Sequence, residues 1–215
     1  PFAFQRPFDS YIIENVLFKI AYPAAFHAQS GVEAAIRLHP LVKDRLADIE
    51  RVEVRCHNSS MVILDKTGPL HNPADRDHCM QYMMAVGMIK GSLTAEDYED
   101  HVAADPRIDA LREKMRLTEY ERYEKDYHDP DKRSNANSIQ VFFKDGSSTP
   151  LSEVEYPLGH RCRRAEGIPL LMEKFEKNVA RVFAAKRRLR ILGVCLDQQA
   201  LEAMPVHEFV DLMAL

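Results

Sequence analysis

The stretch NPADRDHCMQYMMAVGMIKG, residues 72–91, predicts one structural element more clearly than any other part of the sequence. Asn72 is suited to cap a helix and Pro73 to occupy its first turn. Gly91 is suited to end the same helix. The side chains from Met80 onward are apolar on nearly every side. We therefore predict a helix that runs to Lys90 and is buried all round.

Strand patterns lie on both sides of this helix. Residues 49–56 alternate between apolar and polar side chains, which predicts a strand with one buried face. Residues 138–144 and 151–155 flank an Asp145-Gly146 turn, and together they predict a β-hairpin. The spacing of apolar residues predicts further helices at residues 23–38, 94–101 and 106–115.

The last part of the chain has helical patterns only. They cover Ile168–Phe183, Lys186–Leu196 and Val206–Met213. The order of elements predicts an α+β fold: a small two-layer domain with an antiparallel or mixed sheet at residues 19–160, followed by C-terminal helices at residues 161–215. We interpret residues 1–18, which hold two prolines and several aromatic side chains, as a connector. The sequence does not open on methionine, and we interpret it as part of a longer protein.

Composition narrows the function classes. The 215 residues are 46% hydrophobic and 29% charged, with a formal net charge of −4. This balance argues against nucleic acid as a partner, which would require a basic excess. No apolar run reaches the roughly 20 residues that span a bilayer. The four cysteines form no CxxC pair, so no local zinc or iron–sulfur pattern is present, and we expect reduced, mostly buried thiols.

Several stretches of the chain resemble the MmgE/PrpD family, in order and at comparable spacing. Each is weak alone, and together they favour the branch of the family that dehydrates 2-methylcitrate. They are ENVLFK and YPA within residues 14–24, GPL and NPADRDHC within residues 68–79, DYHDP at 126–130, YPLGH at 156–160 and PVHE at 205–208.

The resemblance implies an architecture and an activity. The chain would be the C-terminal half of an enzyme with a large helical domain and a smaller α+β domain, and the active site would lie in the cleft between them. The C-terminal helices would belong with the helical domain, which the N-terminal half supplies. The implied reaction is loss of water from 2-methylcitrate to give 2-methyl-aconitate in propionate catabolism, with citrate or cis-aconitate as further substrates. The resemblance also implies no cofactor and no iron–sulfur cluster, a homodimer, and a cytoplasmic location, or the mitochondrial matrix in a eukaryote.

Three residues are candidates for catalysis. Dehydration of a hydroxy-tricarboxylate needs cations to hold carboxylates, a base for a carbon-bound proton and an acid for the departing hydroxyl. Lys19 precedes a predicted helix start and matches the family's catalytic lysine, although spacing alone fits a solvated linker residue. Tyr82 matches a family site tyrosine, although core packing with one hydrogen bond also explains it. His27 lies close to a family histidine whose position differs by two residues in cis-aconitate decarboxylase.

Four more residues are candidates for substrate binding. Arg76 could clamp a carboxylate or form a helix-surface ion pair, and His78 would lie four residues before Tyr82 on one helix face. His160 and Arg163 belong to a compact basic cluster that could recognise carboxylates or contact an acidic surface of the partner domain. We expect no metal ligands.

Two alternatives to the dehydratase stay open at this point. One is another activity of the family, such as decarboxylation of cis-aconitate or an epimerisation. The other is a non-catalytic interface or binding module, inactive without the N-terminal half, because a site between two domains is incomplete in either one.

Overall fold

The computed structural model describes residues 16–214, which divide into two compact units, one ending at Arg164 and the other beginning at Ala165. Most of the predicted connector, residues 1–15, lies outside the described residues. The elements of the first unit are η1 (Phe26–Ala28), α2 (Gln29–Val42), η2 (Leu46–Asp48), β1 (Ile49–Cys56), α3 (Asn58–Leu64), α4 (Pro73–Arg76), α5 (Met80–Lys90), η3 (Ala95–Tyr98), α6 (Asp100–Ala103), α7 (Pro106–Arg112), β2 (Met115–Glu119), α8 (Glu121–His128), β3 (Asn137–Phe143) and β4 (Ser152–Val154).

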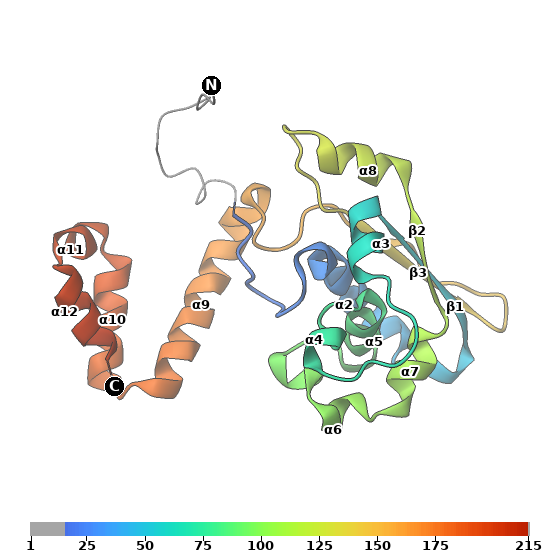
Figure 1. Cartoon of the computed structure of the whole chain (residues 1–215), viewed down its shortest axis with the longest axis horizontal. Coiled ribbons are helices and arrows are strands. Elements are labelled where there is room, and N and C mark those ends of the chain that lie inside the picture. Colours follow the sequence, from blue (N-terminus) through green and yellow to red (C-terminus); the bar gives the residue numbers. More distant parts are fainter. Residues whose placement is uncertain (1–15, 215) are drawn as a thin grey trace. The chain divides into compact units, whose positions relative to one another are not determined.

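The first unit contains a four-stranded mixed sheet in the order β2-β1-β3-β4 (Figure 1). β1 pairs in parallel with β2 and antiparallel with β3, and β3 pairs antiparallel with β4. The predicted strand at residues 49–56 and the predicted hairpin are therefore confirmed. So is the α+β class with a mixed sheet.

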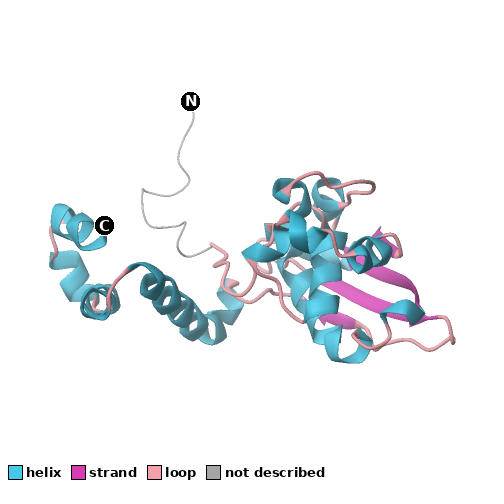
Figure 2. Cartoon of the chain, turned by 90° about the horizontal axis from the view of Figure 1, so that it is seen from below, coloured by secondary structure: helices cyan, strands magenta, loops and turns pink. Residues whose placement is uncertain are grey.

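Helices α2 and α5 pack on each other, and α2 packs on β3 and β4. Figure 2 shows helices packed against the sheet. The side chains of Ile49, Val52 and Val54 on β1 face this layer and are fully buried. Each apolar side chain of this size contributes about 1.5–3 kcal/mol when it leaves water. The opposite face of the sheet is more polar, and the Arg51 guanidinium lies 3.8 Å from the centre of the Phe142 ring. One face of the sheet thus supports the core.

The predicted helix at residues 72–90 is two helices. Asn72 caps α4 by accepting the Asp75 N–H at 2.9 Å, and Gly91 ends α5 in a left-handed conformation, as predicted. Between them residues 77–79 form a turn. A continuous helix would carry charged and polar residues of the first turns into the buried layer, so the chain turns before α5 begins. His78 therefore precedes α5, and the prediction that it shares a helix face with Tyr82 is wrong.

The bounds of other predicted helices also differ from those in the structure. Residues 23–28 do not belong to α2, which begins at Gln29 and continues to Val42. The predicted helix at residues 106–115 ends at Arg112, and Met115 begins strand β2. This strand has inward apolar side chains at only two positions, so its local pattern does not differ from the end of a helix. Helices α3, α8 and, in the second unit, α11 were not predicted.

The second unit is helical. The 3-10 turn η4 (Arg161–Arg163) is the last element of the first unit. The helices that follow it are α9 (Arg164–Val182), α10 (Ala185–Leu196), α11 (Gln198–Ala203) and α12 (Val206–Met213). The three helical stretches predicted here are confirmed. A small core of Val179, Ile191 and Leu212 joins α9, α10 and α12.

Two properties of the described residues bear on location and redox state. Within residues 16–214, no helix is both long and apolar enough to cross a bilayer. All four cysteines are free thiols. Cys56 and Cys79 are buried and Cys195 is partly buried. Cys162 is exposed, and there the structure differs from the expectation of buried thiols.

Candidate functional site

A hollow of about 350 Å³ in the first unit brings together three segments that are far apart in the sequence. One wall comes from the chain before and within η1, one from the end of α8 and the loop that follows it, and one from the 3-10 turn before α9. The lining residues are Leu17, Phe26, Tyr127, His128, Arg133, Ser134, His160 and Arg161.

The lining is basic and contains an unused hydroxyl. Arg133 and Arg161 contribute guanidinium groups, and the Arg161 Nη2 donates to the Asp131 carbonyl oxygen at 2.9 Å. Arg133 has a φ of 46°, a left-handed conformation that non-glycine residues rarely adopt. Ser134 is 1% exposed, and among the described residues its Oγ has no hydrogen-bond partner. Guanidinium groups and a hydroxyl in one concave surface are suited to bind a carboxylate.

Two imidazoles lie beside this hollow. His27 stands on η1 and His57 at the end of β1, and their ring centres are 5.0 Å apart, edge to face. The ring of Tyr127, which lines the hollow, stacks on His57 at 4.0 Å and meets His27 edge-on at 5.6 Å. The three rings thus form one cluster, which we call the His27–His57–Tyr127 cluster.

Both histidines of the cluster are held in the neutral form. Burial lowers the pKa of His57 to about 4, although the Asn135 side chain opposes this shift. Burial also lowers the pKa of His27, again opposed by Asn135. The Nδ1 atom of each ring is buried and has no hydrogen-bond partner among the described residues. A neutral imidazole with an unpartnered nitrogen can accept a proton or a hydrogen bond.

His160 lines the hollow but has both ring nitrogens in use. Its Nε2 donates to the Arg133 carbonyl oxygen at 3.1 Å, and its Nδ1 accepts the Cys162 N–H at 3.2 Å. Burial lowers the pKa of His160. These contacts fix the loop that carries Arg133, so we assign His160 to the wall of the hollow.

Arg163, which was predicted together with His160 as part of a basic cluster, contacts α2. Its Nη1 lies 2.9 Å from both carboxylate oxygens of Glu33 and donates to the Tyr156 carbonyl oxygen at 2.8 Å. Glu33 also accepts from Arg37 and from the Leu158 N–H. This buried carboxylate therefore anchors the whole 156–163 segment, which carries one wall of the hollow.

Lys19 is exposed, on a segment that runs past Gly159. The Phe18 N–H donates to the Gly159 carbonyl oxygen at 3.2 Å, and the neighbouring Ile20 is buried. Leu17, two residues earlier, lines the hollow. Among the predicted catalytic residues, Lys19 and His27 thus belong to the part of the fold that forms the hollow.

Tyr82 lies in other surroundings, inside the buried helix α5. Its hydroxyl donates to the Asp97 carbonyl oxygen at 2.5 Å, and its ring stacks on Tyr98 at 6.1 Å. Burial raises the pKa of Tyr82 to about 12. The phenol thus stays protonated and joins α5 to η3.

Arg76 and His78 also have protein partners. Arg76 is buried, donates to the Tyr98 carbonyl oxygen at 2.5 Å and pairs with Asp100 at 2.7 Å. His78 is exposed, and its Nδ1 lies 2.6 Å from the Asp77 carboxylate. The structure therefore brings Arg76 and Tyr82 together around η3, and places His27 and His160 around the hollow.

Several residues of the site were not singled out in the sequence. His57 and Asn135 have no chemical spacing that marks them, and they meet only in the fold. Tyr127 and His128 fall within the DYHDP stretch, which supported the resemblance without a role for either residue. A polar residue directly after a buried strand was the available signal for His57, because strand ends often carry functional side chains.

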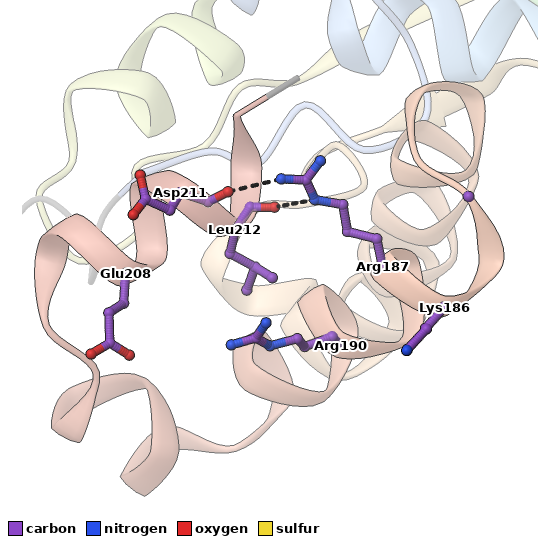
Figure 3. Close-up of a pocket in the computed structure, with 7 residues that line it drawn as sticks. Lys186, Arg187, Arg190, Glu208, Asp211 and Leu212 are labelled. Carbon is purple, nitrogen blue, oxygen red and sulfur yellow. Dashed lines mark hydrogen bonds between the residues drawn. The ribbon is translucent and has the colours of Figure 1, made fainter.

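A second hollow, of about 470 Å³, lies between α10 and α12 in the helical unit (Figure 3). Arg187 donates to the carbonyl oxygens of Asp211 at 2.8 Å and Leu212 at 3.1 Å. Lys186 and Arg190 line it together with the acidic Glu208 and Asp211, so this lining carries charges of both signs. We therefore take the basic hollow of the first unit as the candidate site.

No metal site is evident in the part of the chain that the structure describes. Within residues 16–214, no group of three or more His, Cys, Asp or Glu side chains is placed to hold a metal ion.

Comparison with known proteins places the chain in a family. The family model described as the MmgE/PrpD C-terminal domain matches residues 22–198. The 2-methylcitrate dehydratase of Cupriavidus necator is 55% identical over 218 residues, covering 100% of this chain and 45% of the relative. That of Escherichia coli K12 is 52% identical over 217 residues, again with 45% of the relative covered. The mitochondrial 2-methylcitrate dehydratase of Yarrowia lipolytica is 49% identical over 98% of this chain and 41% of its own length.

The chain spans less than half the length of these relatives, and the matched region includes the hollow and both imidazoles. The chain belongs to the MmgE/PrpD family, and residues 22–198 form that family's C-terminal domain.

Proposed function

We propose that the protein is a lyase that removes water from 2-methylcitrate to give 2-methyl-aconitate, in the methylcitrate cycle of propionate catabolism. The observation that carries the proposal is the identity of about half of all residues, along the entire chain, with proteins named 2-methylcitrate dehydratase. The basic hollow supports it, because the substrate carries three carboxylates that need cationic partners.

Substrate binding is assigned to the hollow. Arg133 and Arg161 each supply a guanidinium group that can bind a carboxylate in two hydrogen bonds. The buried Ser134 hydroxyl can donate a further hydrogen bond to the same anion. Lys19, on the segment that borders the hollow, supplies a third cation for the remaining carboxylate.

Proton transfer is assigned to the histidine side of the hollow. The elimination needs a base that removes a proton from carbon next to a carboxylate, and an acid that protonates the leaving hydroxyl. His27 is suited to act as the base because its lowered pKa keeps the imidazole neutral at pH 7. Lys19 is suited to stabilise the charge that develops on the carboxylate as the proton leaves. Tyr82, which matches a family site tyrosine, and Arg76 and His78, which were proposed from their place on the predicted helix, stay predictions for the complete protein.

The proposal includes the context of the reaction. The N-terminal helical domain would close the hollow and supply further acid–base groups, and the complete protein would act as a homodimer without a cofactor. We propose a cytoplasmic location, or the mitochondrial matrix in a eukaryote; the name of the Yarrowia lipolytica relative describes that protein as mitochondrial.

The test uses the full-length protein that carries this chain. 2-Methylcitrate, citrate and cis-aconitate are supplied separately, while absorbance of the new conjugated double bond and release of carbon dioxide are followed in parallel. We expect an absorbance rise with 2-methylcitrate and no carbon dioxide. Carbon dioxide release from cis-aconitate would instead support a decarboxylase. No change with any of the three substrates would refute the proposal.

Variants at the site sharpen this test. Lys19→Ala, and Arg133→Ala combined with Arg161→Ala, should lower kcat/KM for 2-methylcitrate by roughly 10²-fold or more, because each removes a charge-assisted contact to the substrate. Arg51→Ala, on the polar face of the sheet, is the matched control and should leave kcat/KM unchanged. Equal rates in all of these proteins would contradict the assignment of the hollow.

A further inference from the structure

His57 is a fully buried histidine at the end of β1, and neither the sequence nor the proposed reaction has assigned it a role. It is 0% exposed. Its Nε2 lies 3.1 Å from the Asn135 Oδ1 and 2.9 Å from the Ser60 Oγ. A buried imidazole with two polar partners on one nitrogen is held in a single orientation.

The Asn135 amide determines which nitrogen of His57 carries the proton. The Asn135 Nδ2 donates to the Phe26 carbonyl oxygen at 2.8 Å, so its Oδ1 is the atom that faces His57. The reversed amide would place two acceptor oxygens against each other. An amide oxygen accepts, so the His57 Nε2 must donate and the proton resides there. The Nδ1 of His57 is then the unprotonated nitrogen, and it is buried without a partner among the described residues.

The fixed ring has two neighbours that belong to the site. Its face stacks on Tyr127 with an angle of 10° between the planes, and its edge meets the ring of His27. Tyr127 lines the hollow, and His27 is the base of the proposed reaction. Since ring contacts of this kind are directional, an imidazole that cannot rotate also limits the rotation of its two neighbours.

We propose that His57 is a positioning residue for the reaction: Asn135 and Ser60 hold its ring with the proton on Nε2, and the ring holds Tyr127 and His27 in place beside the hollow. This inference rests on the proposed function for the identity of the base, and on the contacts above for the geometry. His57 does not touch the substrate and acts through its two neighbours. It must stay neutral, because a charged imidazolium would need a hydrogen-bond acceptor at Nδ1.

The surroundings of His57 favour the neutral ring on balance. The titratable groups that face it are His27 from η1 and Glu124, Tyr127 and His128 from α8. His27 and His128 lower its pKa, Glu124 raises it, and burial outweighs all three. The Glu124 carboxylate is itself engaged, because it accepts from the Asn58 N–H at 2.8 Å and from His128 at 2.9 Å.

The first experiment reads the tautomer directly in the full-length protein. Long-range ¹H–¹⁵N spectra of protein labelled with ¹⁵N-histidine, assigned with a His57→Gln variant, distinguish a proton on Nε2 from one on Nδ1. We expect His57 to be neutral at pH 7, with the proton on Nε2, and to begin to titrate only below pH 5, in line with its pKa of about 4. A proton on Nδ1, or a titration midpoint near 6.5, would overturn the proposal.

The second experiment changes the amide that holds the ring. Asn135→Asp replaces the amide with a carboxylate of the same shape, which favours the protonated imidazole in both histidines. We expect the acid limb of the pH profile of kcat/KM to move to higher pH by about one unit or more, together with the His57 titration. Gln140→Glu makes the same amide-to-acid change on β3, where the amide donates to the Thr149 carbonyl oxygen, and should move neither.

The outcomes separate this inference from the proposed function. A merely structural role for His57 would lower stability in His57→Gln but leave kcat/KM for 2-methylcitrate unchanged, and that result would overturn the inference. Asn135 acts on the pKa of His27 as well as His57, so an acid limb that stays in place in Asn135→Asp would also overturn it. Lack of turnover of 2-methylcitrate by the unchanged protein would instead overturn the proposed function, and the positioning role with it. The tautomer of the unchanged protein still decides the geometry if the Asn135→Asp protein does not fold.

Discussion

Gly159 offers the sharpest test of how the segment that carries Lys19 is held. The residue has a φ of 100°, and a Cβ added to it would lie 1.9 Å from the Phe18 carbonyl oxygen. The carbonyl oxygen belongs to the backbone and the backbone also fixes the position of a Cβ, so no side-chain rotation can relieve the contact. We predict that Gly159→Ala displaces the segment at residues 18–20 from the 156–163 loop.

The expected cost has two parts. A residue with a side chain in the left-handed region loses about 1–2 kcal/mol relative to glycine. Displacement of Phe18 also breaks the hydrogen bond from its N–H to the Gly159 carbonyl oxygen, which contributes about 0.5–1.5 kcal/mol. The sum is about 1.5–3.5 kcal/mol in the free energy of unfolding. The loss cannot be much larger, because the segment can detach without unfolding the core.

Gly146→Ala is the matched control for this prediction. Gly146 also has a left-handed φ, of 82°, but nothing lies within 4 Å of the position of its Cβ. Only the conformational cost applies, so urea unfolding should show about 1–2 kcal/mol for this variant. Turnover should fall in Gly159→Ala, where Lys19 moves, and stay normal in Gly146→Ala. Equal losses of stability and unchanged turnover in both variants would refute the argument from close approach.

Three more predictions concern buried polar groups. Glu33→Gln should lower the free energy of unfolding by about 1–3 kcal/mol and raise KM, because Arg163 loses its carboxylate and one wall of the hollow loosens; chemical denaturation and initial rates measure both. Tyr82→Phe should lower the free energy of unfolding by about 1 kcal/mol because the Asp97 carbonyl loses its donor, whereas a roughly 10²-fold loss of turnover at unchanged stability would place the hydroxyl on the substrate instead. The unfolded chain binds a proton at His57 below pH 6.5, and the folded protein does so only below about 4. The free energy of unfolding should therefore decrease as the pH is lowered from 6.5 to 4, by up to about 1.4 kcal/mol per pH unit. His57→Gln should remove this part of the slope, and identical slopes in both proteins would contradict a buried neutral imidazole.

Local signals in the sequence predicted the elements whose shape is decided locally. The alternation at residues 49–56 matches β1, and the Asp145-Gly146 turn joins β3 and β4. Asn72 caps α4 and Gly91 ends α5 as expected. Each of these features depends on neighbours within a few residues, so the sequence pattern carries the information.

Features that depend on distant partners were not predicted. Strand β2 exists because its backbone pairs with β1, and its five residues show no distinctive pattern. The break at residues 77–79 follows from the burial of α5, since a longer helix would bury charge. Residue spacing alone therefore merged two helices, α4 and α5, into one and missed strand β2.

The candidate site was predicted in part. The family resemblance pointed to Lys19 and His27, and the basic cluster pointed to His160. In the structure His160 lines the hollow, His27 contacts the ring of Tyr127 in its lining, and Lys19 lies on the segment that borders it. His57 and Asn135 could not be predicted, because 78 positions separate them and only the pairing of β1 with β3 brings them within 3.1 Å. Arg133 needed the loop conformation after α8 before its role could be stated.

The sheet order has a consequence for how the protein is made. Val52 pairs with Met115 on one side and with Val141 on the other, so both partners of the central strand come from much later in the chain. During synthesis the backbone edges of β1 must wait until β2 and β3 have left the ribosome, and closing such long loops is entropically slow. Until then these edges are open to other chains, so early molecules of this protein should depend on chaperones more than its small sheet suggests.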